Sequence, residues 1–405
     1  MLRLFNSLGK KYQLFHPANK NVVKIFTCGP SVYQKAHIGN FRTFLFEDIL
    51  VRYLEYKGYT VLRGMNFTDI EDKTIQEAEK TNMPLRKLTD MNIKEFIREM
   101  KLLRIKIPDH LSRASESVNE AAEIINQLLH RGIAYWHKGN VYFDPQRSPR
   151  FGELYGLDMS KWPKKKKRFH KDTYPGIQWN LGDFILWHGC RKRDRYCWET
   201  EIGSGRPSWN IQDPSMIIQC CNETLSVYCG GIDNLYRHHD YTKAILESVK
   251  PYPLSKFWLH CHHLYVDGRK MSKSKGNILY TDTLMRQGYA SRDIRFFLIY
   301  GHYRSKLNYS EERFQIVIEK LRAFQKRARS VRQHSSKRTK SDNILSKKLQ
   351  HVFEENMDRD LNVRGAFDSM YSVLSQYNSR EYPPEFSSCI LSTLQDIDCV
   401  LKVIF

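Results

Sequence analysis

Hydrophobic and polar positions at the start of the chain follow the order strand, loop, helix, strand. Residues 22–28 form a short apolar run that ends at a Gly-Pro pair, which is typical of a buried strand. Between residues 39 and 57 apolar side chains recur every four positions, and Gly58 follows where a helix C-terminal cap is expected. Residues 61–66 are a second strand-like run. This order is the unit of a parallel nucleotide-binding sheet, so it predicts an α/β fold of Rossmann type.

The pattern changes further along the chain. Residues 85–133 are mostly helical in period, whereas 134–205 break into short aromatic segments separated by Gly and Pro, which indicates an insertion. Strand-like runs return at 216–218 and 257–265, and the chain is helical in period after Tyr309. This last region has two apolar stripes, Phe314, Val317, Ile318, Leu321, Phe324 and Leu349, Phe353, Met357, Leu361, and the polar residues 330–342 between them predict a solvated linker.

We therefore expect four parts in this chain of 405 residues, which is too long for one ordinary core. Residues 1–133 and 206–310 would be the two halves of one Rossmann-type domain. Residues 134–205 would be an inserted connective region, and 311–405 a helical bundle.

Composition narrows the class of partner. Lys and Arg number 65 against 44 Asp and Glu, a net charge of +21, which favours a polyanion such as RNA. Basic residues concentrate at 164–168, 191–195 and 322–340. No apolar run is long enough to cross a membrane, and no amphipathic basic helix suggests a membrane surface. The nine cysteines, an odd number at uneven spacings, predict free thiols and a reducing cytoplasm.

Two short motifs carry the chemistry. His37-Ile38-Gly39-Asn40 lies where the first helix begins, and unpaired N–H groups at a helix start suit phosphate oxygens. The absence of a side chain at Gly39 lets a nucleotide approach, with His37 and Asn40 as donors beside it. The second motif, KMSKS at 270–274, offers Lys270, Ser272 and Lys273 to the charge that develops on ATP phosphates. Either motif alone is weak evidence, but both in this order indicate an ATP site, and neither a Walker loop nor GxGxxG is present.

These motifs belong to a longer series of segments by which the chain resembles the cysteinyl-tRNA synthetase family of class I. The resemblance implies a Rossmann core split by a connective insertion, then a stem-contact region and a helical bundle. It also implies that Mg·ATP activates an amino acid, which then passes to tRNA. The shared segments are TCGPSVY at 27–33, HIGN at 37–40, NFTDIEDK at 66–73, GRPSW at 205–209, GGID at 230–233, HH at 238–239, VDGR at 266–269 and HYRS at 302–305.

Residue roles follow from the resemblance. It implies that His37, Asn40, Lys270 and Lys273 are catalytic, that Asp233 lies near the adenosine, and that the amino acid contacts Gly29, Thr68, Trp209 and His238.

The family's zinc site is altered in this sequence. The resemblance implies two cysteines, a histidine and a glutamate as ligands, but only Cys28 and His238 match, because Asp213 replaces the second cysteine and Thr242 the glutamate. Zinc could remain on Cys28, Asp213 and His238, or a neighbour such as Asp240, Cys220 or Cys229 could complete the site. Alternatively the metal is lost and the pocket accepts another amino acid. We expect loss or serious weakening of the site, since two replaced ligands are hard to compensate.

The acceptor also has alternatives. The family continues past the bundle into an anticodon-reading domain, which this sequence is expected to lack. A related ligase, which joins cysteine to an amino sugar in mycothiol synthesis, is similarly short and uses no tRNA. The three hypotheses are a cysteine–tRNA ligase acting as a monomer, a ligase that passes an aminoacyl-adenylate to a small amine or carrier, and a non-catalytic RNA-binding paralogue. Intact ATP motifs disfavour the third.

Overall fold

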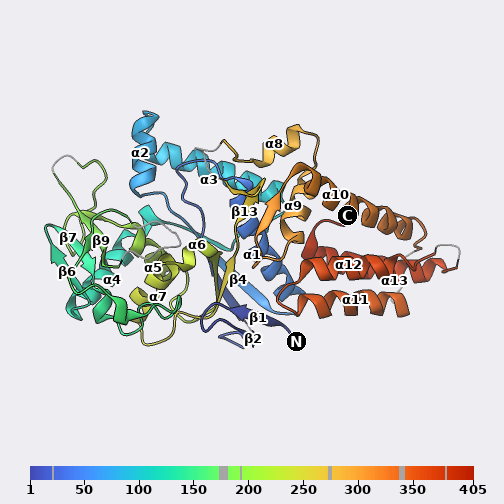
Figure 1. The fold of residues 1–405 in the computed structure, drawn as a ribbon, viewed down its shortest axis with the longest axis horizontal. Coiled ribbons are helices and arrows are strands. Elements are labelled where there is room, and N and C mark those ends of the chain that lie inside the picture. The colour runs from blue at the N-terminus through green and yellow to red at the C-terminus, as the bar shows by residue number, and fades with distance from the viewer. Residues whose placement is uncertain (21, 173–180, 192–193, 272–275, 337–342, 379–380) are drawn as a thin grey trace.

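A computed structural model describes residues 1–20, 22–172, 181–191, 194–271, 276–336, 343–378 and 381–405. A parallel sheet occupies the middle of an elongated molecule, between a β-rich insertion at one end and a helical bundle at the other (Figure 1). This arrangement confirms the predicted fold class, whereas the boundaries of the four parts stay a prediction. Among the described residues, no helix combines the length and the apolar character that a membrane span requires.

The central sheet has five parallel strands in the order β12-β11-β3-β4-β5. The strand order reverses between β3 and β11, where Cys28 N–H donates to the Cys229 carbonyl at 3.1 Å. Ligands of open α/β sheets bind outside the carboxyl ends of the strands at such a reversal. The strands are β3 (Val22–Thr27), β4 (Thr60–Phe67), β5 (His110–Arg113), β11 (Leu225–Gly231) and β12 (Ser255–Cys261).

Helix α1 (Ile38–Tyr56) connects β3 to β4 through the core. The predicted glycine follows the end of this helix. Gly58 has a φ of +89°, which glycine adopts without Cβ strain, and its N–H donates to the Glu55 carbonyl. The helices that complete this half are α2 (Asp72–Lys80), α3 (Leu85–Leu102) and α4 (Val118–His130), with a 3₁₀ turn at Ala114–Glu116. The predicted stripe of α1 is buried throughout: Phe41, Leu45, Ile49 and Tyr53.

The insertion contains its own sheet, drawn in green in Figure 1. Its order is β10-β9-β7-β6 with antiparallel neighbours, and β8 pairs with β9 in parallel. Its elements are β6 (Ala134–His137), β7 (Asn140–Phe143), β8 (Arg168–Phe169), β9 (Asp183–Gly189) and β10 (Gly205–Pro207), with 3₁₀ turns at Pro145–Arg147 and Met159–Lys161.

The prediction of free thiols throughout is wrong for one pair of cysteines. Cys190 and Cys197 form a disulfide in the connection between β9 and β10. The antiparallel pairing of β9 with β10, extended by a bridge between Trp198 and Gly205, folds this connection back on itself. That long-range pairing brings the two sulfurs together and cannot be read from cysteine spacing.

The predicted strand at residues 216–218 is also wrong, because these residues lie in helix α5 (Trp209–Cys220). Ser208 caps this helix by accepting a hydrogen bond from Asn210 N–H at 3.2 Å. A short apolar run does not distinguish a buried strand from a fully buried helix segment. The following elements are α6 (Ile232–Leu235), α7 (His238–Glu247), α8 (Thr281–Arg286), α9 (Ser291–Tyr300), and the small sheet of β13 (Leu264–Val266), β14 (Arg269–Lys270) and β15 (Leu307–Tyr309).

The C-terminal region is helical, as predicted. Both apolar stripes are buried, but the predicted linker begins too early, because residues 330–333 continue helix α10; residues 337–342 lie outside the described part. The helices are α10 (Glu311–Gln333), α11 (Ile344–Met357), α12 (Val363–Leu374) and α13 (Pro384–Leu401), and a hairpin of β1 (Arg3–Asn6) and β2 (Lys11–Leu14) lies beside the sheet.

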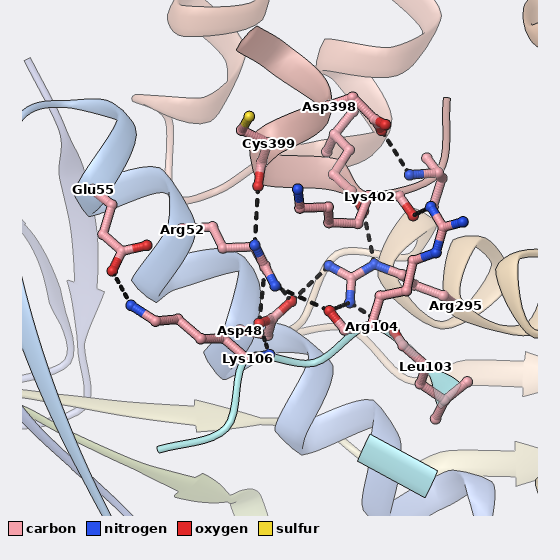
Figure 2. A network of polar contacts seen from close by, with 12 residues as sticks. Asp48, Arg52, Glu55, Leu103, Arg104, Lys106, Arg295, Asp398, Cys399 and Lys402 are labelled. Carbon is pink, nitrogen blue, oxygen red and sulfur yellow. Dashed lines mark hydrogen bonds and ion pairs between the residues drawn. The ribbon is translucent and has the colours of Figure 1, made fainter. Parts of the chain in front are cut away.

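One buried carboxylate joins the catalytic half to the bundle (Figure 2). Asp48 of α1 accepts hydrogen bonds from Arg295 of α9 at 2.6 Å, from Arg52 at 2.9 Å and from Lys106 N–H at 2.7 Å. The side chains of Asp48 and Arg295 are both 0% exposed. Arg295 Nε also donates to the Leu401 carbonyl at 2.7 Å, so the same guanidinium holds the end of α13.

Replacing Arg295 by Met should destabilise the fold strongly. The change keeps an unbranched apolar stem but leaves Asp48 buried with one cation fewer, and breaking a buried pair from one side costs about 3–5 kcal/mol. Urea unfolding followed by tryptophan fluorescence measures the loss. Arg86→Met is the matched control, because Arg86 pairs with Glu116 at an exposed position and should contribute about 0–1 kcal/mol. Similar losses in both variants would contradict this account.

Candidate active site

A cavity of about 380 Å³ opens at the sheet reversal between β3 and β11. Residues from before the insertion and residues from after it both contribute to its walls. Nine residues singled out in the sequence line it: Cys28, Gly29, His37, Gly39, Asn40, Thr68, Trp209, Asp233 and Lys270. The other two described members of that set, Asp213 and His238, lie behind the Trp209 ring.

His37 and Asn40 close the start of α1 by capping each other. The His37 ring nitrogen Nδ1 accepts from Asn40 N–H at 3.2 Å, and Asn40 Oδ1 accepts from His37 N–H at 3.0 Å. Since Nδ1 is an acceptor, the neutral ring carries its proton on Nε2. Burial lowers the pKa of His37, although the Asp233 carboxylate acts in the opposite direction, so the neutral donor form persists at neutral pH. This helix start can therefore donate to phosphate oxygens.

The two sides of the second ATP motif approach this helix start. Ile38 N–H donates to the Leu279 carbonyl at 3.0 Å. Met271 lies so close to Gly39 that a Cβ on Gly39 would come within 2.4 Å of the methionine methyl carbon. Lys270 Nζ lies 3.5 Å from His263 Nε2. The motif residues Ser272 and Lys273 fall outside the described residues.

The opposite end of the cavity is held by Asn66 at the end of β4. Its Oδ1 accepts from Gly29 N–H at 2.8 Å, and its Nδ2 donates to Asp213 Oδ1 at 2.9 Å. A Cβ on Gly29 would lie 1.8 Å from the Asn66 carbonyl oxygen, so only glycine fits there. Trp209 stacks on His238, with ring centroids 3.9 Å apart and planes 10° apart.

Three possible metal ligands converge at this end, Cys28 in the cavity wall and Asp213 and His238 beyond it. Donor atoms of Cys28, Asp213 and His238 all lie within 4.8 Å of one another. Asp213 Oδ2 accepts from Tyr228 OH at 2.7 Å and pairs with His238 Nε2 at 3.0 Å. Burial raises the pKa of the Cys28 thiol well above its ordinary value, and the Asp213 carboxylate adds to the effect.

The alternative ligands considered from the sequence do not join this group. The Thr242 hydroxyl donates to the His238 carbonyl at 2.9 Å. Asp240 accepts from the backbone N–H groups of residues 152 and 155, which holds part of the insertion against α7. Neither Cys220 nor Cys229 belongs to a metal-ligating group within the described residues.

The donor set suits zinc in an open site. Catalytic zinc ions take three protein ligands and leave one position for water or substrate, and Cys, Asp and His are all accepted ligand types. The buried Nδ1 of His238 has no hydrogen-bond partner among the described atoms, so this ring nitrogen is still available to a ligand. Binding must, however, disrupt the contact between Asp213 and His238, which opposes tight retention of a metal.

Sequence reasoning missed two histidines of the cavity. Strand alternation predicts that His260, His262 and His263 point to different faces, but β12 ends at Cys261, and both His262 and His263 line the cavity. Burial lowers the pKa of His262 to about 4. His260 instead lies in the core, with Nε2 2.9 Å from His239 Nδ1. The signal that could have found them is their place directly after a strand of the sheet, at its carboxyl end.

Comparison with known families agrees with this site. Residues 14–319 match the family described as tRNA synthetases class I (C) catalytic domain. The match covers more than half of the chain, and the chain belongs to this family of adenylate-forming class I synthetases.

Individual relatives extend the comparison. The chain is 35% identical over 413 residues to the cysteine–tRNA ligase of Chlamydia pneumoniae, covering 100% of this chain and 86% of that protein. It is 34% identical over 387 residues to the cysteine–tRNA ligase of Leptospira interrogans serogroup Icterohaemorrhagiae, covering 93% and 81%.

Solved structures share the fold. Methionyl-tRNA synthetase of Mycobacterium tuberculosis in complex with methionyl-adenylate superposes with a TM-score of 0.66 at 14% identity, covering 94% of this chain and 90% of that one. The LeuRS of Agrobacterium radiobacter K84, in a ternary complex with tRNA, also gives 0.66, at 12% identity and with 96% and 85% covered.

Protein purified without added metal should contain less than one zinc per chain. Zinc can bind only if the contact between Asp213 and His238 breaks, which opposes its retention, whereas a substrate thiolate would supply a fourth ligand. By linkage, cysteine should tighten zinc binding at least about tenfold, whereas serine should not. Competition with a chromophoric chelator measures both affinities.

The matched control restores the family's ligands. The double variant Asp213→Cys with Thr242→Glu should retain zinc without any amino acid. Stoichiometric zinc in the unmodified protein, unchanged by cysteine, would falsify the prediction.

Proposed function

We propose that this protein activates cysteine with ATP and transfers it to tRNA, acting as a monomer. The observation that carries the proposal is the single cavity at the sheet reversal. At one end it has the start of α1 and the flanks of the lysine motif. At the other end the half-buried Cys28 meets the buried Asp213 and His238, a donor set suited to a thiol-binding metal. Relatives named cysteine–tRNA ligase at 34–35% identity support the same activity.

The phosphate end would bind ATP as its Mg²⁺ complex. In this proposal, His37 Nε2–H and the α1 backbone donate to phosphate oxygens, while Gly39 leaves room for the nucleotide and Asp233 contacts the adenosine. Lys270 and Lys273 neutralise charge on the α-phosphate and the departing pyrophosphate, and the Ser272 hydroxyl donates a hydrogen bond to the nucleotide. Asn40 keeps His37 in its donor tautomer.

The amino-acid end would orient the carboxylate for attack on the α-phosphate. Gly29, Thr68 and Trp209 line this end of the cavity, and His238 supports the Trp209 ring from behind. Fixing both reactants in one cavity lowers the entropic part of the barrier. After attack, the P–O bond to pyrophosphate breaks and the aminoacyl-adenylate remains. A hydroxyl of the tRNA ribose then attacks its carbonyl carbon, takes the aminoacyl group and releases AMP.

Zinc would bind Cys28, Asp213 and His238 in this site. When bound, it supplies a soft Lewis acid that prefers the sulfur of cysteine to the hydroxyl of serine. Without that preference, packing and hydrogen bonds distinguish such similar side chains by only about 1–3 kcal/mol.

Basic surface residues support RNA as the acceptor, rather than a small amine. Arg322, Lys326, Arg329 and Arg332 are exposed along α10. In the insertion, Lys164, Lys165 and Lys167 are exposed, whereas Lys166 pairs with Asp144 at 2.8 Å and Asp183 at 3.1 Å. We further propose that residues 134–205 and 311–405 act as RNA-contacting parts on either side of the catalytic halves 1–133 and 206–310.

ATP–pyrophosphate exchange across all twenty amino acids, with and without zinc, tests the activation step. We expect exchange with cysteine, and Lys273→Ala should reduce it about a hundred- to a thousandfold, because one preorganised donor to developing phosphate charge is lost. Near-normal exchange in this variant would contradict the role of the lysine motif. Exchange with a different amino acid would reassign the substrate.

The salt dependence of tRNA binding tests the acceptor. Neutralising Lys164, Lys165 and Lys167 should lower the slope of log affinity against log salt by about one per lysine that contacts a phosphate, with amino-acid activation unchanged. Lys166 is kept because it is paired. Neutralising Lys87 and Lys101, both exposed on α3, is the control and should leave the slope unaltered. Absence of tRNA binding at low salt would favour a small-amine acceptor.

A further inference from the structure

Asp172 is a buried carboxylate of the insertion that touches the wall of the candidate active site. Its side chain is 0% exposed, and Oδ1 accepts from the backbone N–H of Trp209 at 3.0 Å. The same oxygen pairs with His188 Nε2 at 2.9 Å. Arg206 NH1 lies 3.6 Å from Oδ2. A buried carboxylate with these partners links β9, β10 and α5.

The charge of Asp172 is balanced by the protein itself. Burial would raise its pKa, but the hydrogen bond with His188 and the charge of Arg206 outweigh burial, so the pKa lies below its ordinary value. Asp72, Asp172 and His188 also have donor atoms close enough for a metal. Arg206 NH2, however, donates to Asp72 at 2.6 Å, so a guanidinium already supplies the cation between the two carboxylates.

Trp209, the partner of Asp172, begins helix α5. A carboxylate at this position satisfies a helix-start N–H and interacts favourably with the positive end of the helix dipole. The same helix carries Asp213 one turn later, and the Trp209 ring covers His238. The position of the α5 start therefore decides where the ring stands against the cavity.

A second connection reaches the other side of the cavity. Asp72, which Arg206 holds, is the first residue of α2 and directly follows Glu71, a lining residue. Through Arg206, Asp172 thus joins the two chain segments that border the amino-acid end, one leading into α2 and one into α5.

We propose that Asp172 is a positioning residue for amino-acid binding, through which the insertion sets the place of Trp209. The expected effect on amino-acid binding rests on the proposed function, whereas the role of Asp172 in holding the start of α5 does not. Loss of Asp172 frees the α5 start and leaves Arg206 with Asp72 alone. The Trp209 ring then no longer forms a fixed wall for the amino acid, while the ATP end keeps its own contacts.

Kinetics of pyrophosphate exchange test the proposal with Asp172→Ala and Asp172→Asn. In Asp172→Ala the KM for the amino acid should rise at least about tenfold and the KM for ATP should stay within about twofold, since misplacing a binding group by about 1 Å can cost a hundredfold in rate. Asp172→Asn should be intermediate, because its amide oxygen still accepts from Trp209 N–H but brings no charge to Arg206. Asp144→Asn is the control, a buried insertion carboxylate bonded to Lys166 and to Gln146 N–H.

Hydrogen exchange of the peptide that covers residues 208–216 gives a readout independent of activity. It should be faster in both Asp172 variants than in the wild-type protein, and unchanged in Asp144→Asn. Equal rises in both KM values, or unaltered exchange in α5, would overturn the positioning role. If the wild-type protein exchanges pyrophosphate with no amino acid, the proposed function fails, and hydrogen exchange alone decides whether Asp172 holds α5.

Discussion

The buried contact between Asp48 and Arg295 is the constraint on which the arrangement of the molecule depends. α1 carries the phosphate-facing motif at its start and Asp48 near its middle, so whatever holds Asp48 also holds the motif. Burial would raise the pKa of Asp48, but the charges of Arg295 and Arg52 lower it, and the carboxylate stays ionised. An ionised group that is buried away from solvent is stable only when charged or hydrogen-bonding partners surround it. Here the partners are Arg295 of α9 and the N–H of Lys106, in the loop before β5.

The same network attaches the end of the bundle to the catalytic half. Asp398 accepts from the N–H groups of Val403 and Ile404 at 2.7 and 2.8 Å, which shapes the chain after α13. Arg104 donates to the Phe405 carbonyl at 2.9 Å, so this segment lies against the loop that follows α3 (Figure 2). The bundle is therefore not an appendage joined by one linker.

The amino-acid end depends on one side chain in a comparable way. Asn66 connects Gly29 to Asp213, and so relates the first strand of the sheet to α5. Asp213, where the resemblance implies a cysteine, offers a hard oxygen in place of a soft sulfur, and this oxygen also accepts from Tyr228. The substitution keeps the geometry of a donor group but shifts its chemistry from metal binding toward hydrogen bonding. With one sulfur ligand fewer from the protein, preference for a thiol would depend more on the bond between zinc and the sulfur of the substrate.

The sequence by itself determined the class of fold, the order of most elements and the residues of both ATP motifs. These features are local: a four-residue apolar period, a capping pair three residues apart or a glycine after a helix is decided by neighbours along the chain. The first strands and α1 therefore appear where the pattern predicts them, and nine of the expected site residues line one cavity.

Only the tertiary structure decided the rest. The apolar run at 216–218 is helical because it continues helix α5, which packs Met216 and Ile217 into the core, and Cys190 meets Cys197 because two strands pair across the insertion. Asp172 and His263 reach the site through contacts between segments far apart in the chain. The pattern of residues along the chain does not indicate such contacts. Their energy comes from burial and charge pairing, which exist only after the sheets and helices have packed together.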